Sequence, residues 1–414
     1  MKIIELTKET TDNLLEELLQ RSPNSYGEYE SCVNEIIENV RTRGDEAVFE
    51  YTRRFDGADI DAEHILVTDD EIQQAYQEVD ASLLDVIRKS LASIRSFHEK
   101  QCQNSWFESK DNGVILGQRV IPLEKVGVYV PGGKAVYPSS VLMNIIPAKA
   151  AGVEHIIMTT PPGKDGKVNP STLVAAKEAG ADAVYKVGGA QAVAAMAFGT
   201  RRIPKVDKIV GPGNIYVALA KKAVFGYVSI DSVAGPSEIL VLADETANPV
   251  FASADLLSQA EHDEMASAIM ITTSRELAEK VSKEADRFTA GLSRRDIIQK
   301  SLDHYGYILV AKNMEEAVAA ANAIASEHLE ILAKNPFEIM TKIRNAGAIF
   351  LGPYSSEPLG DYYAGPNHVL PTNGTARFFS ALGVDDFIKK SSIISNSKEA
   401  FEQVYKDIIQ FAES

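Results

Sequence analysis

Val206-Asp-Lys-Ile-Val-Gly-Pro-Gly-Asn214 indicates the fold of this chain most directly. It joins a short apolar run to a Gly-x-Gly turn, and a helical pattern then continues to Phe225. A strand, such a turn and a helix begin a dinucleotide-binding unit, because bare backbone lets a pyrophosphate approach a helix N-terminus. Tyr216 stands where the third glycine of the fingerprint would be, although Asp231 follows at roughly the acidic spacing. The fingerprint is therefore incomplete, and a plain turn is an equally good interpretation.

Two more glycine turns follow apolar runs. They are Val130-Pro-Gly-Gly133 and Val187-Gly-Gly-Ala-Gln191. One such turn means little, but open α/β folds bind their ligands in a crevice at the carboxyl ends of the strands. Three turns of this kind together favour a cofactor site there.

Outward from these turns, short apolar runs alternate with helical patterns of about ten to fifteen residues. This alternation is typical of βαβ units and mainly parallel sheets. Residues 1 to about 110 instead have a helical, charged pattern, with a helix expected from about Ile72 to Lys100. The expected strands lie at 126–130, 156–160, 183–187, 208–210, 228–230, 239–242, 269–272, 307–310 and 348–351.

Length and charge narrow the class of protein. The chain has 414 residues, 45% of them apolar, which is enough for two or more domains with their own cores. A net charge of −16 leaves no basic surface to attract nucleic acid or an acidic membrane. The N-terminus lacks the apolar core of a signal peptide, and no run is long enough to span a membrane. Two cysteines make no disulfide framework and fit a reducing cytoplasm.

The stretch Asp255-Leu-Leu-Ser-Gln-Ala-Glu-His-Asp263 is interpreted as the end of an amphipathic helix that begins near Pro249. Gln259 and His262 are three residues apart, so their side chains project from one face. A glutamine oxygen and a histidine nitrogen on one face could hold a zinc ion. Such a pair is more often solvated or locked in the core, so the pattern alone is a weak indication.

Two other polar clusters lie in apolar surroundings downstream. Glu327 and His328 are adjacent at the end of a predicted helix, where an acid and an imidazole can exchange protons. Their simpler interpretation is a helix end at which the histidine meets the helix dipole. Asp361 and His368 stand in a loop rich in glycine, proline and aromatic residues. Asp361 there would be a good hard ligand, but a structural role for His368 is as plausible as a functional one.

Two familiar chemistries are disfavoured. The chain has no His-Glu-x-x-His, so a metalloprotease of that type does not fit. Neither Cys32 nor Cys102 is near a glycine turn, so an aldehyde would have to be oxidised without a cysteine thiohemiacetal.

With these motifs in view, the chain resembles the histidinol dehydrogenase family from about residue 30 to its end. The matching motifs are long and family-specific. They occupy Val126–Ser139, Val210–Tyr216, Ser232–Glu238, Asp255–Asp263, Ser326–Glu330 and Ala364–Thr372.

The resemblance implies a cytoplasmic homodimer with NAD and one zinc ion per subunit, which oxidises L-histidinol through L-histidinal to L-histidine with two NAD. His328 would remove the alcohol proton, and Glu327 would activate water to hydrate the aldehyde. By the same resemblance, Gln259, His262 and Asp361 are metal ligands that also face the substrate, with Ser237 and His328 as further substrate contacts. The NAD contacts would be Tyr129, Gln191 and Asn214.

The fold expected from pattern and resemblance together is α/β, with two incomplete Rossmann-like domains of the aldehyde-dehydrogenase kind. Residues 130–237 are predicted to form an inserted NAD-binding domain. Residues 1–129 and 238–382 are predicted to form the catalytic, metal-bearing domain with the N-terminal helices. Residues 383–414 are predicted to form a C-terminal helical segment.

One departure from the family concerns the C-terminus. Family members carry a short tail with a glutamate and, five residues later, a histidine, which complete the partner subunit's site. The sequence stops at Ser414, just before that glutamate, and Glu413 is out of register as a substitute. We therefore expect weaker zinc and substrate binding. Two alternatives follow: a related dehydrogenase of another small polar alcohol, or a chain that dimerises and binds NAD with little activity.

Overall fold

The glycine turn at Gly211 lies at one end of a five-stranded parallel sheet in the computed structural model, which describes residues 1–21, 27–132 and 138–414. The strand order is β6-β5-β4-β7-β8, so the order reverses between β4 and β7. Such a reversal opens a crevice at the carboxyl ends of the strands. The strands are β4 (Lys125–Tyr129), β5 (His155–Thr160), β6 (Ala183–Lys186), β7 (Lys208–Val210) and β8 (Ser229–Ile230).

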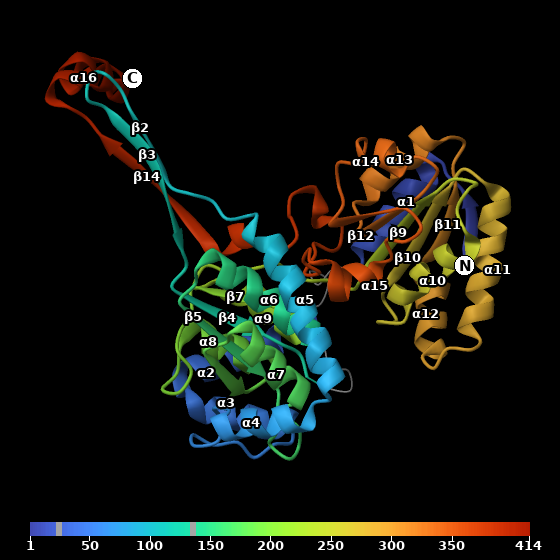
Figure 1. Ribbon diagram of the computed structural model, residues 1–414, viewed down its shortest axis with the longest axis horizontal. Coiled ribbons are helices and arrows are strands. Elements are labelled where there is room, and N and C mark those ends of the chain that lie inside the picture. Colours follow the sequence, from blue (N-terminus) through green and yellow to red (C-terminus); the bar gives the residue numbers. More distant parts are fainter. Residues whose placement is uncertain (22–26, 133–137) are drawn as a thin grey trace.

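Helices cover both faces of this sheet (Figure 1). One face carries α6 (Pro138–Ala151) and α7 (Pro170–Ala179), and the other carries α8 (Gly189–Phe198) and α9 (Ile215–Val224). The N-terminal helices form an outer layer. In this layer, α2 and α3 pack on α8 and α9, whereas α4 and α5 pack on α6 and α7. Their bounds are Gly27–Arg43 for α2, Asp45–Phe55 for α3, Asp69–Glu78 for α4 and Ala81–Glu99 for α5.

This packing corrects the predicted division of the chain. Residues 1–129 were expected to belong with 238–382, but α2 to α5 and β4 join the five-stranded sheet, because their apolar stripes are buried against α6 to α9. The helix expected from about Ile72 to Lys100 is also two helices. They part at Asp80, whose carboxylate accepts a hydrogen bond from the backbone N–H of Ser82 and caps α5.

A second, six-stranded parallel sheet has the order β1-β11-β10-β9-β12-β13. Apart from the edge strand β1, this is the same topology as in the first sheet. The predicted α/β fold with two Rossmann-like units is thereby confirmed. The strands are β1 (Lys2–Glu5), β9 (Glu238–Ala243), β10 (Ser267–Thr272), β11 (Gly306–Val310), β12 (His328–Leu332) and β13 (Ala348–Leu351).

Helices on each face bury this sheet in two apolar clusters. The first helix, α1 (Lys8–Leu19), follows the edge strand β1, which the sequence patterns did not predict. The remaining helices are α10 (Pro249–Ala260), α11 (Arg275–Thr289), α12 (Arg295–Tyr305), α13 (Met314–Ile324), α14 (Pro336–Met340) and α15 (Glu357–Leu359). No helix in the described ranges is both long and apolar enough to cross a membrane.

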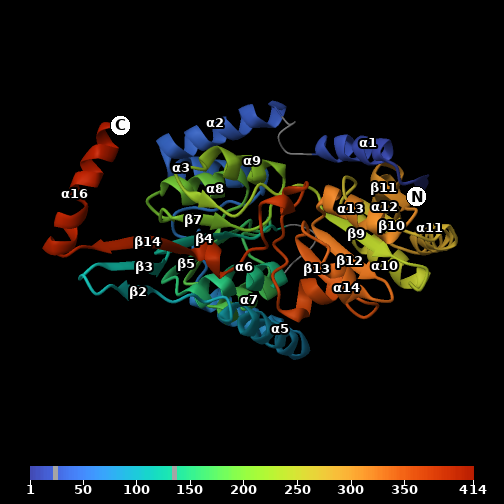
Figure 2. The same ribbon diagram turned by 90° about the horizontal axis from the view of Figure 1, so that it is seen from above.

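A third, antiparallel sheet forms an arm that reaches away from the body (Figures 1 and 2). It contains β2 (Trp106–Ser109), β3 (Ile115–Pro122) and β14 (Ile388–Ser395), and α16 (Lys398–Glu413) lies at its end. The segment 383–414, predicted to be helical, therefore forms a long helix only over Lys398–Glu413, and Ile388–Ser395 is a strand. The strand β14 is mostly polar and exposed, so it lacks the apolar run that marks the buried strands.

Candidate functional site

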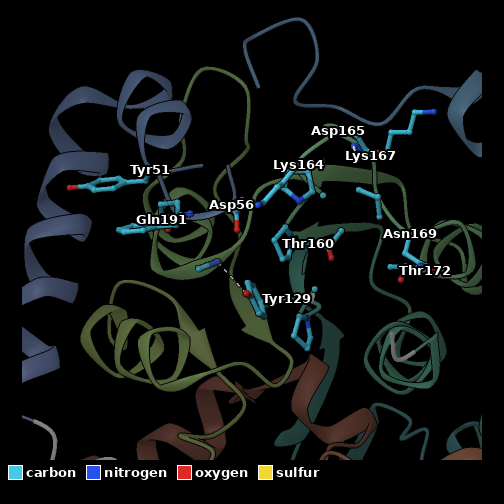
Figure 3. Close-up of a pocket in the computed structure, with 18 of the residues that line it drawn as sticks. Tyr51, Asp56, Tyr129, Thr160, Lys164, Asp165, Lys167, Asn169, Thr172 and Gln191 are labelled. Atoms are coloured by element: carbon cyan, nitrogen blue, oxygen red, sulfur yellow. Dashed lines mark hydrogen bonds between the residues drawn. The ribbon is translucent and has the colours of Figure 1, made fainter. Parts of the chain in front are cut away.

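A cavity of about 1270 Å³ opens at the carboxyl ends of β4 and β5 (Figure 3). It is larger than most small-molecule pockets, which hold roughly 300–1,000 Å³. All three residues expected to bind NAD, Tyr129, Gln191 and Asn214, line it. Two of the glycine turns, at Gly132 and Gly189, line it as well, whereas Gly133 lies outside the described residues.

The three side chains are held in different ways. The Tyr129 hydroxyl accepts a hydrogen bond from the backbone N–H of Gly189 (3.1 Å, Figure 3), and burial raises the pKa of Tyr129 to about 12. Asn214 caps α9, because its oxygen accepts from the backbone N–H groups of Tyr216 and Val217. Gln191 is 1% exposed, yet neither atom of its amide has a hydrogen-bond partner. A buried amide without a partner is costly, which suggests that a ligand satisfies it.

The Gly211 turn is fixed from both sides. Its φ is +115°, and an added Cβ would lie 2.0 Å from the carbonyl oxygen of Tyr129, so only glycine fits. The Lys221 ammonium donates to the Gly211 carbonyl (2.9 Å), and the Asp231 carboxylate accepts from the Gly211 N–H (2.8 Å). Asp231, which follows the turn at the acidic spacing of a dinucleotide fingerprint, therefore holds the turn itself.

Asp56 also lines the cavity, and the sequence patterns did not single it out. It lies near Gln191 and Tyr129 in Figure 3, one carboxylate oxygen has no hydrogen-bond partner, and burial raises its pKa to about 6. The Arg53-Arg-Phe-Asp-Gly57 stretch looks like an ordinary charged helix end, so the sequence offered no signal for this residue.

The second polar cluster lies at the amino ends of β9 and β12, the edge that open α/β sheets do not usually use. One residue, Glu238, holds both members of the acid–imidazole pair. Its backbone N–H donates to the Glu327 carboxylate (2.9 Å), and its carbonyl accepts from Nδ1 of His328 (3.0 Å). Nδ1 must therefore carry a proton, which leaves Nε2 as the free base of a neutral ring. Nε2 is buried without a hydrogen-bond partner and lies 3.7 Å from the Asp361 carboxylate.

Burial and charge shift the pKa values of this pair. Burial raises the pKa of Glu327 to about 7, although the nearby imidazole opposes the shift. Burial alone would lower the pKa of His328, but the carboxylates of Glu327 and Asp361 outweigh it and raise that pKa to about 9. With these pKa values His328 is largely protonated at neutral pH, whereas Glu327 is about half ionised. His328 therefore becomes a base only when a bound cation offsets the charge of the carboxylates around it.

Asp361 is the second residue of a π-helical turn, Gly360–Ala364, directly after α15. His328, Glu357 and Asp361 bring their ligand atoms within 4.8 Å of one another, a spacing that would suit one metal ion. His368, predicted in the same loop, hydrogen-bonds through Nδ1 to the Asp361 carbonyl (3.0 Å). Burial lowers the pKa of His368 and favours its neutral form.

Gln259, near the end of α10, and His262, in the turn that follows, lie at the same edge, because this helix runs back from the far end of β9. Burial lowers the pKa of His262, and the charges of Asp361 and His328 act on it as well. Gln259 is 1% exposed and neither amide atom has a hydrogen-bond partner. Ser237, in contrast, is half-buried in the linker before β9, where its carbonyl accepts from the Ser267 N–H (3.0 Å). Among the described residues, the Ser237 side chain makes no hydrogen bond to this cluster.

Three acids of this cluster, two of them buried and one half-buried, were not singled out by the sequence patterns. Glu357 accepts a hydrogen bond from the Ser258 hydroxyl (2.9 Å), and burial raises its pKa to about 8. Glu330 accepts from the Glu357 N–H (3.0 Å) and faces Asp255, and burial raises the pKa of both acids. Glu330 and Asp255 lie within motifs already quoted, but Glu357 sits in a Glu-Pro-Leu stretch that resembles a surface loop.

Comparison with known proteins bears on this site. A family model described as histidinol dehydrogenase matches residues 19–414. A histidinol dehydrogenase of Caldanaerobacter subterraneus subsp. tengcongensis is 56% identical over 414 residues, 100% of this chain and 96% of that protein. The crystal structure of histidinol dehydrogenase from Elizabethkingia anophelis superposes with a TM-score of 0.94 at 38% identity, covering 100% of this chain and 94% of that one. An NAD-dependent aldehyde dehydrogenase from Sinorhizobium meliloti shares only the fold, with a TM-score of 0.50 at 12% identity over 95% of this chain and 88% of that one.

Proposed function

The chain belongs to the histidinol dehydrogenase family, and we propose that it oxidises L-histidinol through L-histidinal to L-histidine with two NAD. The observation that supports this proposal is the Glu327–His328 pair, whose two side chains are hydrogen-bonded to the peptide groups of Glu238. The Asp361 carboxylate lies 3.7 Å from Nε2 of His328. The pair supplies the base for alcohol oxidation and the acid–base group for hydration of the aldehyde.

The proposed chemistry follows from these contacts. With its proton on Nδ1, His328 presents Nε2 to take the proton of the substrate hydroxyl as hydride leaves for NAD. Glu327, with a pKa near 7, then takes a proton from the water that adds to the aldehyde. As the water adds, protonated His328 returns its proton to the carbonyl oxygen, which completes the hydrate. His328, neutral again, then takes a hydroxyl proton of this hydrate as the second hydride leaves for a second NAD. A positioned base of this kind contributes roughly 10²–10⁴ in rate.

The side chains at this edge fit a zinc site. Gln259 has a buried amide with no partner in the fold, and Asp361 lies among histidines, which together form a nitrogen and oxygen donor set suitable for zinc. We propose Gln259, His262 and Asp361 as the ligands, which would also face the substrate beside Ser237. Zinc held there would polarise the bound substrate's oxygen and favour neutral His328 by competing for the Asp361 charge.

Gln191 supports the NAD assignment and offers a direct test. Gln191→Ala should raise the KM for NAD about tenfold and change kcat little, because one to two hydrogen bonds of about 1 kcal/mol each would be lost. Thermal stability should not fall, since the amide bonds to nothing within the fold. Initial rates at varied NAD measure this.

Gln74→Ala is the matched control. Gln74 lines the same cavity, but its amide already donates to Glu78 (2.7 Å). Its replacement should leave the KM for NAD within about twofold. An unchanged KM in the Gln191 variant would remove that residue from the cofactor site.

We also propose a homodimer in which the arm packs on a second copy of this chain. In α16, the side chains of Phe401, Val404, Ile408 and Phe411 fall on one helix face, and all are exposed in the single chain. Phe411 is 85% exposed, and Ala400 is the only residue of this helix that is buried. An apolar face without a partner marks an interaction site, and the family resemblance indicates a second copy as its occupant.

Ile408→Glu with Phe411→Glu should weaken this dimer by roughly 10³-fold, because two interface anchors of about 2 kcal/mol each would be lost. Light scattering coupled to size-exclusion chromatography should then show a monomer. Gln410→Glu adds a similar charge on the same helix, and this variant should remain dimeric. A dimer that survives the double substitution would show that α16 is outside the interface.

Turnover of L-histidinol with NAD and added zinc tests the proposed function. We expect NADH formation and L-histidine as the product, with other small polar alcohols reacting far more slowly. Turnover of another alcohol with no reaction on histidinol would overturn the substrate assignment.

The two cysteines are exposed and unpaired, which suits the reducing cytoplasm that we propose as the location of the protein.

A further inference from the structure

We propose that Arg21 is a positioning residue for the Glu327–His328 pair, acting through Glu238. This inference rests on the proposed oxidation of histidinol. Arg21 follows α1, far in sequence from every residue considered above for catalysis, and its side chain is completely buried.

The contacts of Arg21 lead to both halves of the site. One guanidinium nitrogen donates to the Glu238 carboxylate (2.5 Å), and the other donates to the carbonyl of Met265 (2.7 Å). Glu238 opens β9, whereas Met265 lies in the turn between α10, which ends near the proposed ligands Gln259 and His262, and β10. Arg21 therefore ties the strand that carries the catalytic pair to the segment that follows the metal ligands.

The role of Glu238 makes this link specific. Its N–H and its carbonyl hold Glu327 and His328 at 2.9 and 3.0 Å, so a shift of this one residue moves both catalytic side chains together. The only ion pair of Glu238 in the described residues is with Arg21, and the two side chains are 5% and 0% exposed. Without Arg21 the buried Glu238 carboxylate would lack its ion-pair partner. Either this carboxylate would take up a proton, or the start of β9 would move so that it reaches water.

Stability alone is a weak explanation for this pair. Buried ion pairs recover their desolvation cost only with good geometry, and apolar pairs of similar volume often stabilise a fold as well. The Nε of Arg21 is buried and has no hydrogen-bond partner, so the guanidinium is not fully satisfied. The peptide groups of Glu238 bond to both catalytic residues. We therefore infer that its ion pair with Arg21 serves to position those two residues.

The test compares Arg21→Met with a matched loss of a buried cation. Arg21→Met should lower kcat for histidinol by roughly 10²-fold, the effect of a small misplacement of catalytic groups. The KM for NAD should stay within about twofold, because the NAD cavity belongs to the other sheet. Lys208→Met removes a buried ammonium that pairs with half-buried Asp386 (3.1 Å) on the other sheet, and it should leave kcat within about threefold.

A double variant separates positioning from stability. Arg21→Met combined with Glu238→Met replaces the ion pair by an apolar one and should recover the melting temperature of the wild type. We expect kcat to stay at least about tenfold low, because apolar packing does not fix the peptide groups of residue 238 to the same register. Recovery of kcat together with stability would show that the pair only stabilises the fold, and wild-type rates in Arg21→Met would also overturn the inference. A wild-type chain that fails to oxidise histidinol would instead refute the proposed function.

Discussion

Replacing His328 by asparagine should lower kcat for histidinol oxidation by roughly 10³-fold, in the middle of the range for loss of a positioned general base. Asparagine can still donate to the carbonyl of Glu238, but it offers no nitrogen that takes up a proton near neutral pH. The folded structure and the KM for NAD should change little, because the NAD cavity lies on the other sheet. Steady-state rates and a thermal melt measure both effects.

His98→Asn provides the matched control. His98 is as buried as His328, but it lies in α5. Its Nδ1 hydrogen-bonds to Gln101 (2.8 Å) and its Nε2 to the Asn367 amide (3.4 Å), and neither bond reaches the catalytic pair. Its replacement should leave kcat within about threefold even if it lowers the melting temperature. Equal losses of kcat in the two variants would mean that removal of any buried histidine harms the enzyme. That result would contradict the assignment of His328 as the general base.

Asp361→Asn should lower zinc affinity by more than about 100-fold, since even partners outside the coordination sphere contribute 10- to 100-fold. The variant loses the carboxylate at the centre of the histidine cluster and keeps its volume. Metal content after equilibrium dialysis measures this without reference to activity. Turnover should fall with the metal content, and chelation of the unmodified enzyme should abolish it.

Glu357→Gln distinguishes the proposed ligand set from the other acid nearby. Glu357 lies within the same group of possible ligand atoms, but its pKa near 8 keeps it protonated at neutral pH, and Ser258 donates to it. We therefore expect this variant to retain zinc. Loss of zinc in Glu357→Gln with retention in Asp361→Asn would exchange their roles and overturn the ligand assignment.

The two parallel sheets could be predicted because buried parallel strands are apolar throughout. In β9, all six residues of Glu238–Ala243 are buried, and five of them are apolar. The edge strand β1 and the three strands of the arm, β2, β3 and β14, were missed, because none of them is buried on both faces. The sequence also could not predict the sheet on which α2 to α5 pack. An amphipathic stripe shows that a helix is buried on one face but does not identify what covers that face.

The site residues that could be predicted are those with reactive side chains inside a family motif or a glycine-rich loop. Glu327, His328 and Asp361 were expected to meet, and the structure brings them together at the amino edge of the second sheet. The supporting acids were not predictable, because burial of a carboxylate depends on distant chain segments. Arg21 and Glu238 are 217 positions apart, and nothing local in either stretch indicates that they form a pair.

The central claim is that Gln259, His262 and Asp361 hold one zinc ion beside the Glu327–His328 pair. A crystal soaked or grown with zinc, with diffraction data collected on both sides of the zinc absorption edge, tests it most directly. We expect one strong anomalous peak per subunit at this edge of the sheet, about 2.0–2.2 Å from the ligand atoms of those three side chains. A peak elsewhere, or none here at saturating zinc, would contradict the claim.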